Sequence, residues 1–290
     1  MGTGTHFDDY GVNQDLETLL DTARRIGVIS HEWAVYSCEG PTDMDKLYKR
    51  DDELRDLDLS SLSFEEFTAF FFAREVVPDD EQYDYFLTDL HGEKYFESVP
   101  SSPEVLVNHL TKLLSEFGQI ASKYTLAQVD QGIWGIWGAN LRLYEFLFVS
   151  SVPLESRLNC IRSMYHVYSD YVSRLEREPN PEIESGIYMW WDLILHGFWD
   201  SSRPVVPGTW RGDASKLDSE SLVVFDVLFE TLTQILAIPN RASQLSALHG
   251  LGHLYHPNVH DTVQRFIDAN PTFFSLKWLE QCRDCDVIGR

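Results

Sequence analysis

Apolar residues recur at every third or fourth position through the last two thirds of the chain, and this spacing constrains the fold more than any other feature. The clearest stripe has successive steps of 4, 3, 4, 3 and 4 residues, through Leu154, Leu158, Ile161, Tyr165, Tyr168 and Val172. A period of 3.5 to 3.6 residues is that of an α-helix with one buried face. The stripe therefore predicts an amphipathic helix that needs neighbours to cover it.

Helix-start signals punctuate these stripes. Prolines and capping residues precede each apolar run, at Ser102-Pro103, Pro153, Asn180-Pro181, Asp218, Pro239-Asn240, His256-Pro257 and Asn270-Pro271. Proline suits the first helical turn, and a Ser, Asn or Asp side chain satisfies an amide that has no partner there. We expect a helix to start at each signal, with the last three helices about 11–16 residues long.

Helices of this length joined by proline-marked turns are typical of stacked antiparallel pairs. The segment 239–269 has this form: a helix, a His-Pro turn and a second helix. Residues 245–254 resemble the first helix of a HEAT-type repeat. Together with residues 128–135, the C-terminal unit makes residues 120–280 similar to helical proteins of unassigned function from bacteria. That resemblance implies an α-helical, HEAT-like fold and carries no catalytic residues across.

The sequence thus predicts an all-α protein of irregular HEAT-like helical pairs, with an α-solenoid-like arrangement over residues 101–290. Residues 1–100 form a more acidic and irregular region. It contains a helix over 16–26, a capping box from Ser63 to Glu66 that opens a short helix through Phe72, and a small β-hairpin built from 83–90 and 94–99. No low-complexity linker divides the two parts, so we expect one continuous domain.

Three glycines at three-residue spacing, Gly132, Gly135 and Gly138, alternate with Trp134 and Trp137. The spacing is not that of a dinucleotide-binding turn, and no strand precedes it. On a helix, such glycines let another element approach closely. We therefore interpret them as packing residues rather than as a ligand groove.

The chain is strongly acidic, with a formal net charge of −23 from 46 acidic and 23 basic residues. The first hundred residues carry 24 acids and 8 bases, so the excess is largest there. Such a chain repels phosphate backbones and anionic lipid, so we expect neither a nucleic-acid nor a membrane partner. Two interpretations stay open: a solubilising surface, or a surface that attracts a basic protein partner.

Targeting and cysteine signals indicate a cytoplasmic setting. The N-terminal residues have no basic region followed by an apolar one, as a secretory signal would. No apolar run approaches the roughly 18 residues that a membrane span needs. Four cysteines in 290 residues do not form a disulfide scaffold, so reduced thiols are expected.

Histidines and a C-x-x-C pair give the only pattern that points to a metal. His249 and His253 lie one helical turn apart, and Cys282 and Cys285 could add two thiolates. However, Pro257 separates this pair from His256 and His260, and the cysteines lie near the C-terminus. We therefore interpret the histidines as packing or turn residues and predict no tightly bound zinc and no cofactor.

The longest connection in the helical part, residues 198–217, holds the candidate binding residues Trp199, Arg203, Trp210 and Arg211. Trp and Arg are enriched in binding hot spots, and long loops in compact domains are often functional. The structural alternative is an ordered cover over the helices in which the tryptophans are buried anchors.

No catalytic motif is present: there is no G-x-S-x-G, no P-loop and no H-E-x-x-H. The leading hypothesis is a non-enzymatic protein-interaction module, such as an acidic inhibitor or immunity-type protein that masks a basic partner. The first alternative is a metal-dependent or hydrolytic enzyme that uses His249 and His253. The second is a structural protein with no ligand site.

Overall fold

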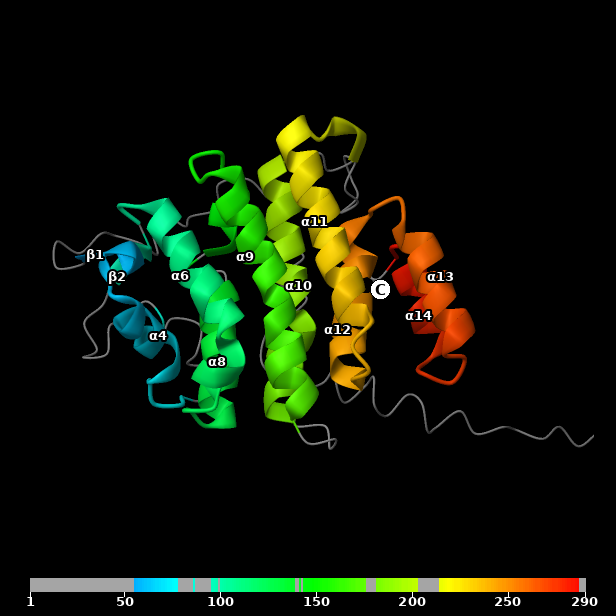
Figure 1. The fold of residues 1–290 in the computed structure, drawn as a ribbon, viewed down its shortest axis with the longest axis horizontal. Coiled ribbons are helices and arrows are strands. Elements are labelled where there is room, and N and C mark those ends of the chain that lie inside the picture. Colours follow the sequence, from blue (N-terminus) through cyan, green and yellow to red (C-terminus); the bar gives the residue numbers. More distant parts are fainter. Residues whose placement is uncertain are drawn as a thin grey trace, which may run out of the picture.

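The computed structural model describes residues 55–77, 86, 95–98, 100–138, 141, 143–175, 181–202 and 214–286. This part of the chain is predominantly α-helical (Figure 1), which confirms the all-α class. The helix expected over 16–26 lies outside the described residues. None of the described helices is both long enough and apolar enough to cross a bilayer.

The α-helices, in chain order, are α4 (Phe64–Phe72), α6 (Pro103–Ser115), α7 (Phe117–Ala121), α8 (Leu126–Trp137), α9 (Leu154–His166), α10 (Pro181–Ser202), α11 (Ser219–Leu236), α12 (Arg241–Leu254), α13 (Val259–Ala269) and α14 (Leu276–Arg283). Helix α9 continues into a π-helical turn, Val167–Tyr171, and then a short 3-10 turn. This irregular continuation carries the end of the stripe found in the sequence. Tyr168 and Val172 are buried like Leu158 and Ile161, while Leu154 and Tyr165 are half-buried.

Two short strands, β1 (Arg55–Leu57) and β2 (Tyr95–Ser98), pair in parallel. Strand β2 overlaps the second strand of the expected hairpin, but its partner is β1. The first strand of that hairpin falls on residues 83–90, of which only Phe86 is described. The hairpin itself therefore stays a prediction.

Most helices begin where the sequence predicts. The Ser63 hydroxyl and the Glu66 carboxylate form the expected capping box at α4. The side chains of Asp218 and Asn240 accept hydrogen bonds from backbone amides three residues on, at 2.7 and 2.9 Å, and so cap α11 and α12. These caps satisfy amides that have no partner within the helix.

The last predicted start is wrong: α14 begins at Leu276, not at Asn270-Pro271. Asn270 instead ends α13, because its backbone and side-chain amides both donate to the Phe266 carbonyl oxygen. The aromatic residues that follow then pack inward, Phe273 against Phe266 with ring centroids 4.9 Å apart. A turn that buries an aromatic ring outweighs the helix-start signal of the proline.

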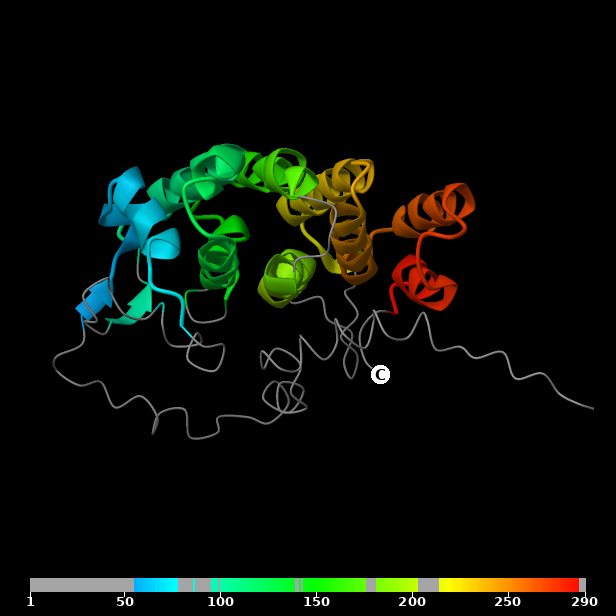
Figure 2. The same ribbon diagram turned by 90° about the horizontal axis from the view of Figure 1, so that it is seen from below.

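The helices form two layers that follow the chain order across the molecule (Figures 1 and 2). In one layer α6 packs on α9 and α9 packs on α11. In the other, α4 packs on α8, α8 on α10, and α10 on α12. Helix α12 also contacts α11 and α14, and α13 packs against α14. One cluster of buried apolar residues runs from α4 to α14 through these contacts.

Glycines allow close approaches in α8, as the sequence predicts for Gly132 and Gly135. Gly138 instead ends the helix, and a Cβ atom there would meet only the Trp134 carbonyl group of the same helix. A Cβ atom on Gly132 would lie 2.3 Å from the Phe72 ring of α4, and one on Gly135 would lie 2.5 Å from Phe86. Contacts this short do not occur between real side chains. The two glycines therefore admit aromatic rings that any larger residue would displace.

The α10–α12 interface is both close and polar. A Cβ atom on Gly250 of α12 would lie 2.8 Å from Cβ of Trp191 on α10. The Ser246 hydroxyl on α12 donates to the Ile187 carbonyl oxygen of α10 at 2.7 Å, and it accepts from the Tyr168 phenol at 2.9 Å. These buried contacts fix how α12 sits on α10.

We expect Gly250→Ala to destabilise the protein by about 1–3 kcal/mol, the usual cost of overpacking a core. The added methyl group would press on the near end of the Trp191 side chain, which cannot move without the helix. Alanine stabilises a helix by about 1 kcal/mol relative to glycine. A net loss in the free energy of unfolding would therefore show that the close contact outweighs this gain. Urea unfolding with an unchanged m-value measures it; an equal or higher free energy of unfolding would contradict the interface.

Candidate functional site

The predicted binding residues do not gather on a described surface. Trp199 lies near the end of α10, is only 5% exposed, and donates its indole N–H to the His253 carbonyl oxygen at 3.1 Å. It thus serves as a core anchor between α10 and α12. Arg203, Trp210 and Arg211 lie outside the described residues, so their role in binding stays a prediction.

The two histidines at one-turn spacing converge with a carboxylate that the sequence analysis did not single out. Asp192 of α10 and His249 and His253 of α12 place their ligand atoms within 4.8 Å of one another. His253 Nε2 lies 2.8 Å from His249 Nε2 and 3.3 Å from Asp192 Oδ1. Both imidazoles are buried, while the Asp192 side chain is 35% exposed. The cluster therefore joins buried nitrogens to a carboxylate that reaches solvent.

The contacts of His249 determine which of its nitrogens carries the proton. Its Nδ1 lies 3.1 Å from the Tyr188 carbonyl oxygen, which can only accept a hydrogen bond. Nδ1 therefore carries the proton, and in the neutral ring Nε2 presents a lone pair toward His253 and Asp192. The His249 ring also stacks flat on the Tyr188 ring, with centroids 4.3 Å apart. Helix α10 thus fixes both the tautomer and the plane of this ring.

Burial keeps both imidazoles neutral. It lowers the pKa of His253 to about 4, against the opposing charge of Asp192 and with help from His249 and His196. Burial also lowers the pKa of His249. In the described part of the chain, His253 Nδ1 is buried and has no hydrogen-bond partner. Both rings are therefore neutral at neutral pH, and each has one nitrogen lone pair that could bind a metal ion.

The cysteines do not join this cluster within the described residues. Cys282 is fully buried in α14, and burial raises the pKa of its thiol. The Cys285 sulfur instead lies 3.9 Å from the Leu251 carbonyl oxygen. The alternative set of two histidines and two thiolates is thus replaced by a set that contains Asp192.

The other two histidines are separated from the first pair, as the Pro257 argument predicts. Helix α12 ends at Leu254, and Tyr255 turns the chain with a left-handed φ of 58°. His256 then accepts from the Asn258 amide through Nδ1, so its Nε2 donates to Asp226 Oδ1 at 3.1 Å. His260 lies on the surface of α13 beside Asp261.

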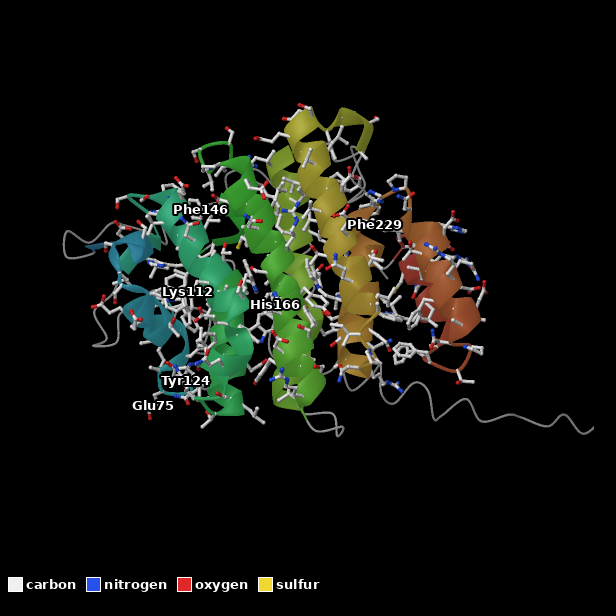
Figure 3. The ribbon with its side chains drawn as sticks, in the orientation of Figure 1. Glu75, Lys112, Tyr124, Phe146, His166 and Phe229 are labelled. Carbon is white, nitrogen blue, oxygen red and sulfur yellow. The ribbon has the colours of Figure 1, made fainter. Side chains whose placement is uncertain are left out.

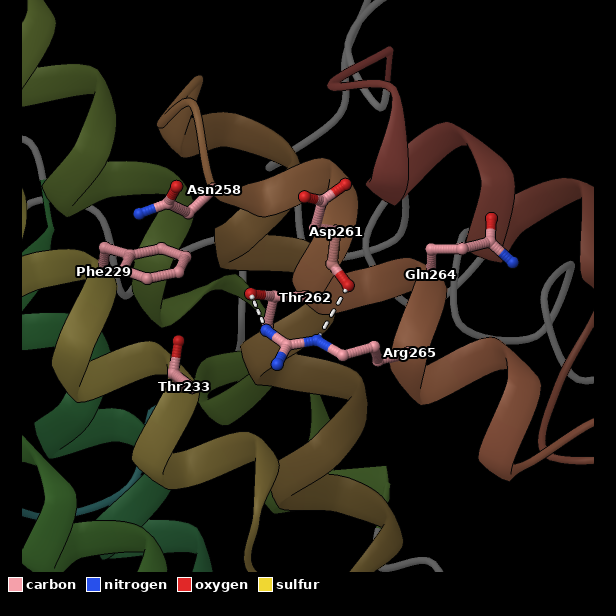
Figure 4. Close-up of a pocket in the computed structure, with 7 residues that line it drawn as sticks. All are labelled: Phe229, Thr233, Asn258, Asp261, Thr262, Gln264 and Arg265. Atoms are coloured by element: carbon pink, nitrogen blue, oxygen red, sulfur yellow. Dashed lines mark hydrogen bonds between the residues drawn. The ribbon is translucent and has the colours of Figure 1, made fainter.

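A groove of about 570 Å³ runs between α11 and α13 (Figure 4). Phe229 of α11 lies on the side that faces Asn258 and Thr262 (Figures 3 and 4) and is half-buried. The Thr233 hydroxyl beside it is buried and has no hydrogen-bond partner in the described part of the chain. On the α13 side, Arg265 donates to the Asp261 carbonyl oxygen and the Thr262 hydroxyl at 3.1 and 3.2 Å. The remaining lining residues are Asn258, Asp261, Thr262 and Gln264.

Exposed carboxylates lie on both helices that line this groove. Asp226 and Glu230 lie one helical turn apart on α11, on the face that also carries Phe229, and both are exposed. The Asp226 side chain is 65% exposed and that of Asp261 is 88% exposed. Arg265 supplies one opposing charge on the α13 side. The groove itself is therefore lined by the aromatic ring of Phe229, one carboxylate, Asp261, and one cation, Arg265. Further acids are exposed on α11.

Comparisons with models of known protein families, with curated proteins and with solved structures found no significant match. We therefore infer a function from the geometry and charge of the chain itself.

The pKa of His253 predicts how stability depends on pH in chelator-treated protein. The folded state keeps this imidazole neutral down to about pH 4, whereas the unfolded chain takes up a proton near pH 6.5. The unfolded state therefore binds more protons between these values, and the free energy of unfolding falls as the pH is lowered.

We expect wild-type protein to lose about 1 kcal/mol more than His253→Gln between pH 7 and 5.5. Urea unfolding at the two pH values measures this difference. His260→Gln removes an exposed histidine and is the matched control, expected to behave like wild type. A wild-type chain that loses no more stability than His253→Gln would show that the buried ring is not held neutral.

Proposed function

We propose that this chain is a non-enzymatic protein-interaction module, an acidic array of HEAT-like helical pairs that binds a basic segment of a partner protein. The packing pattern supports an array of this kind, since the helices from α8 to α12 alternate between two layers and neighbouring helices of each layer pack closely on one another. Arrays of this kind present extended surfaces to partners. Fold alone does not define a function, so the proposal rests on a site.

The observation that carries the proposal is the groove between α11 and α13. A lysine or arginine side chain suits it, because its aliphatic stem can lie on Phe229 while its charge meets Asp226, Glu230 or Asp261. Arg265 repels a cation on the α13 side and so favours a position near α11.

The net charge of −23 supports the same class of partner. Acidic surfaces accelerate encounter with basic proteins, and this acceleration weakens as salt rises. An acidic inhibitor or immunity-type protein, which masks a basic partner, would use both properties. In that role the groove provides specificity and the overall charge accelerates association with the partner.

The second candidate is a metal-dependent or hydrolytic enzyme centred on His249 and His253. One observation favours it, the convergence of these residues with Asp192. Hydrolysis also requires a substrate pocket beside the metal. The described groove of about 570 Å³ is lined by residues of α11 and α13 and includes none of these three. The interaction module is therefore the better-supported proposal.

Peptide selection tests the proposal. Peptides selected from a random library on the purified chain should be enriched in Lys and Arg. For a selected peptide, Phe229→Ala should weaken binding about tenfold, the effect of removing a hot-spot residue. Asp226→Asn combined with Asp261→Asn should also weaken binding, and should reduce its dependence on salt.

Two controls locate the effect. Glu104→Gln removes an exposed acid on α6, far from the groove, and Asp192→Asn alters the histidine cluster (Figure 1). Both should bind the peptide as wild type does. Selection of peptides without basic residues, or equal losses in the controls and the groove variants, would contradict the proposal.

A further inference from the structure

We infer that Asp192, His249 and His253 form a binding site for one transition-metal ion of the zinc class. The site lies apart from the groove and does not depend on the interaction proposal. It also departs from the sequence-based prediction of no bound zinc. That prediction considered only the histidines and cysteines, and did not include the carboxylate that α10 contributes.

The donor set has the composition of known metal sites. Two imidazole nitrogens and one carboxylate oxygen lie within 4.8 Å of one another. Three protein ligands with a further position left open are typical of catalytic zinc and of non-haem iron sites. Calcium and magnesium prefer sites made only of oxygen, so the two imidazoles favour Zn²⁺, Co²⁺, Ni²⁺ or Fe²⁺.

The spacing of the ligand atoms fits a single ion. Zinc binds nitrogen and carboxylate oxygen at about 2.0–2.2 Å, so tetrahedral ligands are separated by about 3.3–3.5 Å. The distance of 3.3 Å between His253 Nε2 and Asp192 Oδ1 already has this value. The two Nε2 atoms, now 2.8 Å apart, need to separate by about 0.5 Å. A small rotation of one ring would suffice, and the proton of neutral His253 would move from Nε2 to Nδ1, which leaves the Nε2 lone pair free for the ion.

Second-shell contacts already orient one ligand. A histidine that binds a metal usually donates its other N–H to a carbonyl or a carboxylate, which fixes the tautomer. His249 does so to the Tyr188 carbonyl oxygen, and its ring is held flat on Tyr188. Its Nε2 lone pair is therefore aimed at the other two ligands before any ion binds.

Exposure of Asp192 gives the ion a route to the site. The residues His249 and His253 are each 6% exposed, whereas the Asp192 side chain is 35% exposed. A hydrated ion can therefore exchange water first for the carboxylate and then for the nitrogens. The open position would face the same side, where a water molecule or a ligand can bind.

The competing explanation is a hydrogen-bond network without metal. In it, His253 Nε2–H donates to His249 Nε2 and Asp192, and Nδ1 keeps an unpartnered lone pair. A structural network of this kind occurs at Asp226 and His256, which are 3.1 Å apart but have no second histidine in hydrogen-bond contact. This second pair provides a matched control.

Metal titration separates the two explanations. Full-length chain without a polyhistidine tag is treated with chelator, and Co²⁺ is then added while the visible absorption is recorded. We expect one Co²⁺ per chain, with the intense bands of four- or five-coordinate cobalt, and displacement by Zn²⁺. Thermal unfolding should move to higher temperature as Zn²⁺ is added, because the ion binds only the folded state.

Variants assign the binding to this site. Asp192→Asn should weaken Co²⁺ binding about 100-fold, since loss of a second-shell partner alone costs 10–100-fold. Asp226→Asn should leave the affinity unchanged. Asp192 is partly exposed, so the variant should fold, which circular dichroism checks. His249→Asn, whose amide nitrogen can take the place of Nδ1 and still donate to Tyr188, serves as a second variant and should also lose Co²⁺ binding.

Three results would overturn the inference. They are a wild-type chain that binds no Co²⁺, an Asp192→Asn variant that binds as tightly as wild type, and equal losses in Asp192→Asn and Asp226→Asn. The last two would indicate ions attracted to an acidic surface only. None of these results concerns peptide binding in the groove, so the interaction proposal is tested separately.

Discussion

The close packing of α12 on α10 is the contact on which the rest of the structure depends. Gly250 lets the helices approach until only a glycine fits beside Trp191. At this distance Ser246 and His249 reach the carbonyl oxygens of Ile187 and Tyr188, 59 and 61 residues away in the sequence. The same contact brings Asp192 to the histidine pair. The close approach of the two helices at Gly250 therefore positions both the central core and the candidate metal site.

Much of the helical fold could be predicted from the sequence because it is encoded locally. Apolar stripes and capping residues such as Ser63, Asp218 and Asn240 act within one or two turns, and the structure shows these caps. The start of α14 could not be predicted in this way. Asn270 and Pro271 carry a helix-start signal, but Phe273 packs against Phe266, a contact that local propensity does not include.

The candidate site was only half predictable. The spacing of His249 and His253 places both rings on one face of a helix, and the sequence shows this directly. Asp192 belongs to another helix, among many acids in a chain with 46 of them. A better signal was Trp191-Asp192, a carboxylate within an otherwise apolar run. The groove between α11 and α13 likewise arises from packing, and no motif marks Phe229 as part of it.

The tautomer of His249 tests this account most directly. Long-range ¹H–¹⁵N correlation spectra of the metal-free chain at neutral pH report which imidazole nitrogen carries the proton. We predict a neutral His249 ring protonated at Nδ1, with Nε2 unprotonated and shifted when Zn²⁺ is added. A neutral ring protonated at Nε2 would mean that His249 does not donate to the Tyr188 carbonyl oxygen. The α10–α12 contact, as described, would then be wrong.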